Sequence, residues 1–279
     1  MTSLNLADTT TPMNQLPRQP IRLGLQGAPG TGKTWAALTF PNPLVWNLDN
    51  KLQGYLEAHP EAIIPVVTPS RELIAGQLRI SNRLAERKQD DPAFPVNIRD
   101  GFKRWIDVLG PELKPEHTLV IDSWSSLMNW FEIQTTLPWE VAVNRMGEED
   151  GFKYWGRLKK YCVDITEKLK ILPCNVVVLC HEQPERDEND RITGKLKPLM
   201  QGSFKDQFAG QLTDFYRQKV ISKSDKDYDK SCVALGFTPK EDPFFVWQAK
   251  SDSVFNACCS IPGLPALVPA CYSSLVRKS

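Results

Sequence analysis

The amino-acid sequence lacks an excess of either charge. It holds 34 lysines and arginines against 33 aspartates and glutamates, which leaves a net charge of +1. A strongly basic balance would indicate a nucleic-acid-binding protein at once, and this balance does not. Any surface that binds nucleic acid must therefore be local and offset by acidic residues elsewhere. With 279 residues, the chain is long enough for one large α/β domain or for two small ones.

Cysteines are few and irregularly placed. There are seven of them, an odd number, and no pair has the CxxC spacing. This pattern argues against both a disulfide framework and a structural zinc site. Reduced thiols in a cytoplasm are the simplest interpretation.

Long apolar runs are missing as well. No run approaches the ~20 residues that a membrane-spanning helix needs. The first residues, MTSLNLADTTTPMNQLPRQP, have neither the basic nor the apolar region of a secretory signal. We therefore expect a cytoplasmic protein with no membrane partner, and we expect residues 1–19 to form a flexible leader.

What the sequence does contain is a phosphate-binding loop. The stretch GAPGTGKT, Gly27 to Thr34, fits the pattern G-x-x-x-x-G-K-[ST] without a mismatch. It follows a strand-like segment, IRLGLQ, and precedes a helical one, which is the context that this motif requires. The glycines let the backbone fold around phosphates with its N–H groups pointing inward. We expect Lys33 to reach the β- and γ-phosphates and the Thr34 hydroxyl to bind Mg²⁺.

Three apolar strands end in polar side chains that suit the chemistry of a triphosphate. TLVI ends at Asp122, which predicts either a second Mg²⁺ anchor beside Thr34 or a cap of the next helix. PLVWNL ends at Asp49, and NVVVLC is followed by His181 and Glu182. Either carboxylate, Asp49 or Glu182, could activate water, and His181 could contact the γ-phosphate. The predicted nucleotide-binding residues are Gly27, Ala28, Pro29, Gly30, Thr31, Gly32, Lys33, Thr34 and Asp122, and the catalytic ones are Lys33, Asp49, His181 and Glu182.

Strands alternate with helices along the chain, which predicts an α/β fold with a mainly parallel sheet flanked by helices. Three further segments indicate a C-terminal group of antiparallel strands: Phe215–Ser222, Ser231–Phe237 and Phe244–Ala249. We expect an ATPase domain over residues 20–252. The apolar tail, residues 253–279, is too hydrophobic to be solvated, so it covers its own domain or packs on a neighbouring subunit.

Taken in order, GAPGTGKT, a short strand ending in LDN, TLVIDSWSSL and NVVVLCHE resemble the RecA-like core of P-loop NTPases. More closely, they resemble a phage-encoded P-loop nucleotide-binding family that includes RecA-fold single-strand annealing and recombination proteins. The resemblance covers about residues 20–222. It implies Mg²⁺-dependent ATP hydrolysis, with Asp49 where RecA-like proteins have a catalytic glutamate and His181 as the γ-phosphate sensor. It also implies a homo-oligomer, either ring or filament, in the cytoplasm of a bacterial host.

The resemblance further implies two DNA-binding loops, Thr135–Gly151 and Pro184–Gly210. The second loop combines cations with an aromatic ring, which suits single-stranded DNA; the residues that we expect to contact DNA are Arg186, Arg191, Lys195, Lys197, Lys205 and Phe204. Acidic residues lie between them, so a solvated surface loop stays open as an alternative. The expected partners are single-stranded DNA, further copies of this chain and a single-stranded-DNA-binding protein.

Two functions compete with ATP-dependent annealing or recombination. One is an ATPase motor or switch without recombinase activity, acting in packaging, helicase loading or partner regulation, which the near-neutral charge favours. The other is a small-molecule kinase, in which residues 182–211 would serve as the lid. Salt-sensitive binding to single-stranded DNA separates the first function from these two.

Overall fold

The computed structural model describes residues 19–49, 51–67, 102, 106–107, 110–135, 151–200, 202–221, 229–230, 233 and 244–276. Residues 1–18 of the predicted leader and residues 136–150 of the first predicted DNA-binding loop, Thr135–Gly151, lie outside these residues. So does the predicted strand at 231–237, apart from Val233, which is helical.

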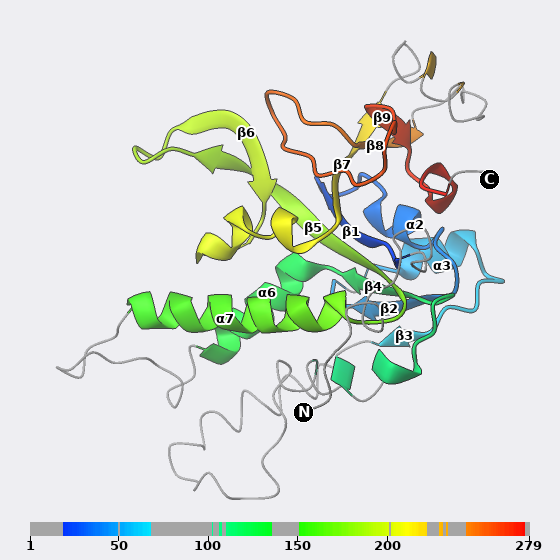
Figure 1. The fold of residues 1–279 in the computed structure, drawn as a ribbon, viewed down its shortest axis with the longest axis horizontal. Helices are drawn as coiled ribbons and strands as arrows, with labels where there is room; N and C mark the ends of the chain where they lie inside the picture. Colours follow the sequence, from blue (N-terminus) through cyan, green and yellow to red (C-terminus); the bar gives the residue numbers. More distant parts are fainter. Residues whose placement is uncertain are drawn as a thin grey trace, which may run out of the picture.

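The elements alternate as the sequence predicts (Figure 1). The strands are β1 (Arg22–Gly27), β2 (Pro43–Asn47), β3 (Val66–Val67), β4 (Thr118–Asp122), β5 (Asn175–Arg186), β6 (Ile192–Pro198), β7 (Asp214–Ile221), β8 (Phe244–Gln248) and β9 (Leu267–Pro269). The α-helices are α2 (Lys33–Ala37), α3 (Gln53–Ala58), α6 (Trp124–Thr135) and α7 (Gly151–Lys170), and short 3-10 turns are η2 (Gly110–Glu112), η3 (Gly202–Asp206), η4 (Ala209–Gln211) and η5 (Tyr272–Ser274).

The strands form one sheet in the order β3-β2-β4-β5-β1-β7-β8-β9, with β6 paired to β5. Strands β3, β2, β4, β5, β1 and β7 are parallel to their neighbours in this order, while β8 and β9 are antiparallel. The structure therefore confirms a mainly parallel sheet with antiparallel strands at its C-terminal end. It corrects one detail: β7 belongs to the parallel part, because it runs parallel to β1 and pairs antiparallel with β8.

Both faces of the sheet are buried, and the side chains of a single strand divide between them. In β5, Val176, Val178 and Cys180 join one apolar cluster, whereas Val177 and Leu179 join the other. Successive residues of a strand point to opposite faces, so a strand that is apolar throughout is what a doubly covered sheet needs. The helices α6 and α7 cover the first face together with η3, and α2 lies on the second (Figure 1).

Strand β5 continues past the sheet and turns back as β6, forming a hairpin that extends from the body of the protein (Figure 1). The sequence predicts that the strand ends at Cys180 and that a long charged loop follows. That prediction is wrong for residues 182–186 and 192–198, which are paired strands with a register shift between Pro184 and Arg186. The change from apolar to charged side chains marks where the strand leaves the core, and the strand itself goes on.

The apolar tail packs on its own domain. Phe255 is 2% exposed and Val268 is fully buried. Residues 267–269 form β9, which pairs with β8, and Leu196 of the hairpin donates its N–H to the carbonyl of Val254. The tail thus contacts its own domain, and the sheet continues across the predicted domain boundary at residue 252.

Among the described residues, no helix has both the length and the apolar composition that would be needed to cross a membrane.

Candidate nucleotide site

The phosphate-binding loop joins β1 to α2 at the carboxyl end of the sheet. Gly30 and Gly32 adopt positive φ angles of 79° and 77°, which a residue with a Cβ rarely adopts. The Thr31 hydroxyl donates to the carbonyl of Ala28 at 2.9 Å and closes the loop on itself. The loop conformation is therefore a property of its glycines and of its own internal hydrogen bonds.

The ammonium of Lys33 lies inside this loop. It donates to the carbonyls of Gly27 and Ala28, at 2.8 Å each, and the residue is only 7% exposed. Burial lowers the pKa of Lys33, although the nearby Asp122 and Glu182 carboxylates act in the opposite direction. A buried cation that is held by two carbonyls and has no ion pair within the described part of the chain is placed to take up an anion.

Thr34 and Asp122 meet although 88 residues separate them: the threonine hydroxyl donates to Oδ2 of Asp122 at 2.6 Å. Hydroxyl and carboxylate oxygens are ligands that Mg²⁺ prefers, usually alongside phosphate oxygens and water. The pair therefore fits the predicted metal anchor. The described residues contain no cluster of three or more histidine, cysteine, aspartate or glutamate side chains that could hold a metal by themselves.

Asp49 and His181 also lie side by side: Asp49 follows the end of β2, and His181 lies in β5 where that strand leaves the sheet. Nε2 of His181 is 3.0 Å from Oδ2 of Asp49. The other carboxylate oxygen, Oδ1, accepts from the hydroxyls of Ser123, at 2.9 Å, and Ser126. Nζ of Lys51 lies 3.4 Å from Oδ2 of Asp49. The carboxylate is thus fixed from several sides.

These contacts decide the protonation state of Asp49. Burial by itself would raise the pKa of Asp49, but the hydrogen bonds from His181, Ser126 and Ser123 outweigh it and hold the pKa well below its usual range. Because an ionised carboxylate can only accept, Nε2 of His181 must carry the proton that they share. Nδ1 of His181 is buried and has no hydrogen-bond partner among the described residues.

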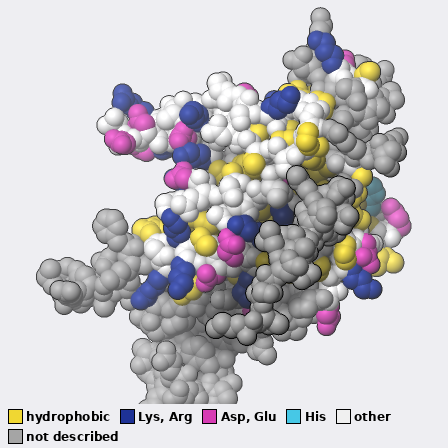
Figure 2. Space-filling view, in the orientation of Figure 1, with side chains coloured by type: hydrophobic (Ala, Val, Ile, Leu, Met, Phe, Trp, Pro, Cys, Tyr) yellow, Lys and Arg dark blue, Asp and Glu magenta, His cyan; other side chains and the backbone are white. Residues whose placement is uncertain are grey.

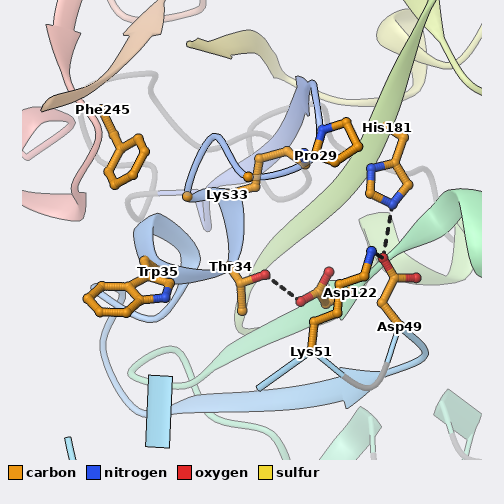
Figure 3. A pocket seen from close by; sticks show the side chains of 11 residues that line it. Pro29, Lys33, Thr34, Trp35, Asp49, Lys51, Asp122, His181 and Phe245 are labelled. Carbon is orange, nitrogen blue, oxygen red and sulfur yellow. Dashed lines mark hydrogen bonds and ion pairs between the residues drawn. The ribbon is translucent and has the colours of Figure 1, made fainter. Parts of the chain in front are cut away.

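One cavity of about 380 Å³ is lined by the charged and hydroxyl side chains of Lys33, Thr34, Asp49, Lys51 and Asp122 and by His181 (Figure 3). That volume is within the range of sites for small molecules. Figure 3 shows His181, Asp49 and Lys51 on one side of the P-loop and the aromatic rings of Trp35 and Phe245 on the other. The sequence-predicted residues that the structure gathers in the cavity are Pro29, Gly30, Gly32, Lys33, Thr34, Asp49, Asp122 and His181.

The structure places Glu182 outside this lining. Its two carboxylate oxygens accept from Nε and Nη2 of Arg217, at 2.9 and 3.1 Å. Both side chains are largely buried, with 10% of Glu182 and 21% of Arg217 exposed. Of the two candidate bases, Asp49 is therefore the one that faces the cavity.

The predicted DNA-binding cations lie on or beside the hairpin, and most of them pair with neighbouring acids. Arg186 pairs with Asp190, Arg191 with Asp187, and Lys197 with both Glu185 and Asp206. Figure 2 shows positive and negative side chains next to one another at the end of this arm. Within the described residues, Lys195 and Lys205 have no ion pair.

Phe204 requires a correction. The sequence places it among residues that could stack on bases, but its ring is 1% exposed. It lies in the core, 6.1 Å from Trp124 and 5.8 Å from Phe208, measured between ring centroids. The turn η3 folds the segment back over α6 and α7, so this ring offers no free face to a base.

Sequence reasoning missed five residues of the site. Ser123 and Ser126 follow the metal aspartate in IDSWSS, and their clustering beside Asp122 was the available signal. Lys51 and Trp35 adjoin residues that were predicted. Phe245 comes from β8 and carries no local signal, because only the antiparallel pairing of β8 with β7 brings it to the P-loop.

A P-loop beside an aspartate that ends a neighbouring buried strand defines a P-loop nucleoside triphosphatase. The family model described as "AAA domain" matches residues 19–221, and the chain belongs to this family. The strand order, with β5 between the P-loop strand β1 and the Asp122 strand β4, is that of a RecA-like core. The phage-encoded subgroup stays a prediction.

Two solved structures are similar to this chain, each at 12% sequence identity. One is a prototypical ATPase from the type III secretion system of pathogenic bacteria, with a TM-score of 0.38 over 71% of this chain; the match spans 50% of that ATPase chain. The other is a KaiC-like protein from the archaeon Pyrococcus horikoshii OT3, with a TM-score of 0.37 over 88% of both chains. A search of curated proteins finds no match.

Proposed function

We propose that this protein hydrolyses ATP at the P-loop in the presence of Mg²⁺, and that single-stranded DNA bound at the hairpin controls this activity in annealing or recombination. The observation that carries the ATPase is the convergence of Lys33, Thr34, Asp122, Asp49 and His181, from different elements, on one cavity. Thr34 and Asp122 would hold Mg²⁺, which would supply neutralisation of the charge that develops on the phosphates.

The chain's own groups divide the remaining work. Lys33 leaves the carbonyls of Gly27 and Ala28 to bind phosphate oxygens. Asp49, ionised and fixed by two serine hydroxyls, accepts a hydrogen bond from the attacking water and aligns it. His181 is held by Asp49 through Nε2, and its ring lines the cavity where the γ-phosphate would lie. Positioning and charge stabilisation of this kind account for most catalysis of phosphoryl transfer.

The link to DNA is proposed from the course of one strand. His181 lies in β5 at the point where the strand leaves the sheet, and the same strand continues to Arg186 in the hairpin. A ligand that shifts the hairpin would therefore act on His181 through the backbone of the same strand. The DNA-contacting residues in this proposal are Arg186, Arg191, Lys195, Lys197 and Lys205, and further copies of the chain would align several hairpins along one strand.

A second candidate is an ATPase switch whose hairpin engages a partner protein instead of DNA. It is favoured by the pairing of Arg186, Arg191 and Lys197 with neighbouring acids, since a paired cation gains less from a phosphate than a free one. A hairpin whose positive and negative side chains alternate suits a protein surface with a complementary arrangement of charges.

ATP turnover with and without single-stranded oligonucleotide separates the two candidates. The proposal expects turnover to rise at least severalfold with oligonucleotide, and binding to weaken steeply between low and moderate salt. The double variant Lys195→Ala, Lys205→Ala should weaken binding and leave DNA-free turnover unchanged. If oligonucleotide neither binds nor changes turnover while ATP is still hydrolysed, the DNA proposal fails and the ATPase stands.

A further inference from the structure

The cavity has two chemically different ends. Carboxylates and His181 gather at one end, and two aromatic side chains, Trp35 and Phe245, stand at the other (Figure 3). The polar end accounts for a triphosphate and for its hydrolysis. The aromatic end has no part in that chemistry, so it needs an explanation of its own.

Phe245 is fixed against the P-loop. A Cβ on Gly32 would come within 2.9 Å of three carbons of its ring, so the ring lies directly over this glycine. The strand that carries Phe245 is tied to the loop as well: Trp247 donates to the side chain of Gln218, which donates to the carbonyl of Thr31 at 2.7 Å. Even so, 39% of Phe245 remains exposed.

The side chain of Trp35, which comes from α2, is also held by its neighbours. It follows Thr34 in α2 and is 43% exposed. The rings of Tyr55 and His59 approach it at centroid distances of 5.3 and 5.5 Å with interplanar angles of 82° and 66°. Edge contacts of this kind fix the indole and leave part of its surface open to the cavity.

We propose that these two rings form the subsite for the nucleotide base, which stacks against Phe245 and Trp35. The inference rests on the proposed function, in which the γ-phosphate lies at the end of the cavity where Asp49 aligns the attacking water beside His181. A triphosphate that runs along the loop with its γ end there directs its nucleoside to the opposite end, where the aromatic rings stand. Stacking on an aromatic side chain gains more from a bicyclic base, so the subsite favours purine over pyrimidine nucleotides.

The test compares the binding of ATP, UTP and inorganic tripolyphosphate by titration calorimetry. Phe245→Leu keeps an apolar side chain on β8 and removes the aromatic plane; Trp35→Leu does the same on α2. Each change should weaken ATP binding roughly tenfold, in line with the usual loss of a base-stacking ring. Tripolyphosphate binding should stay within twofold, and the preference for ATP over UTP should shrink.

Two controls keep the outcomes distinct. Val220→Ala alters the residue that pairs with Phe245 on β7 and is 47% exposed, but it does not line the cavity, so nucleotide binding should not change. Lys33→Ala should weaken the binding of ATP and the binding of tripolyphosphate to a similar extent. Two results would refute the base subsite, provided that Lys33→Ala weakens the binding of both ligands. In one, both leucine variants bind ATP as the wild type does; in the other, they lose affinity for ATP and for tripolyphosphate equally. If Lys33→Ala changes neither ligand, the proposed function itself fails.

Discussion

Nε2 of His181 lies 3.0 Å from Oδ2 of Asp49, across 132 residues of sequence, at the edge of the sheet where the P-loop opens. The contact joins the residue that follows shortly after β2 to a residue within β5, two strands that are separated in the sheet by β4. It gives the cavity an ionised carboxylate and an imidazole in fixed relative positions. The catalytic part of the account follows from this pair.

Asp49→Asn should lower the ATP turnover number by about 100-fold or more, because a positioned base contributes 10²–10⁴-fold. Nucleotide affinity should change by less than about threefold, since Asp49 contacts water and not the phosphates in this scheme. Steady-state kinetics together with equilibrium binding measure the two effects. Glu182→Gln is the matched control and should keep most of the turnover, because Glu182 is engaged by Arg217. The reverse ranking would identify Glu182 as the base.

Ser126→Ala tests how Asp49 is held. The hydroxyls of Ser126 and Ser123 help to keep the pKa of Asp49 low, so removing one donor should raise that pKa. A base with a higher pKa loses its ionised form at higher pH, and the acid limb of the kcat/KM profile should therefore move to higher pH. Ser125→Ala provides a neighbouring control, because the Ser125 hydroxyl accepts from the N–H of His181 and does not contact Asp49. If the acid limb of the Ser126→Ala profile does not shift, Ser126 does not help to lower the pKa of Asp49.

Asp122→Asn should raise the thermal stability of the protein in the absence of Mg²⁺ and nucleotide. Burial raises the pKa of Asp122, and repulsion from Asp49 adds to this effect. A group whose pKa is raised on folding loses its favourable contribution as pH rises through the folded-state pKa, so the stability gain from the amide should grow with pH. Thermal melts of wild type and variant at several pH values measure it, and a destabilised variant at neutral pH would contradict this expectation.

The C-terminal tail gives a prediction about stability alone. Phe255→Ala removes a ring that is 2% exposed and lies 5.6 Å from that of Phe215, and it should cost about 3–5 kcal/mol. Ile171→Ala is the control, since Ile171 is 82% exposed and its loss should cost less than about 0.5 kcal/mol. Urea unfolding of both variants makes the comparison. Equal stabilities would mean that the tail is not part of the core.

The sequence made the polar end of the site predictable because its residues sit at strand ends. Carboxyl ends of parallel strands share one edge of a sheet, so Asp49, Asp122 and His181 had to lie near the P-loop once their strands were placed. Phe245 was not predictable in this way, since its position depends on long-range pairing of β8 with β7. Phe204 was misjudged because a phenylalanine among charged residues looks the same whether its turn faces solvent or folds back onto a helix.

The hairpin was missed for a related reason. The apolar content of a segment predicts which residues are buried, but it does not predict where the strand ends. Residues 182–186 are polar because they have left the core, yet their backbone hydrogen bonds are satisfied by β6. Strand pairing between polar segments has a weak signature in composition.

The measurement that tests the central claim most directly is the steady-state rate of ATP hydrolysis by wild type and Lys33→Ala, each with Mg²⁺ and with excess chelator. The account predicts turnover by the wild type with Mg²⁺, loss of that turnover in chelator, and background rates for Lys33→Ala under both conditions. Hydrolysis by Lys33→Ala at the wild-type rate, or wild-type turnover that persists in chelator, would contradict it.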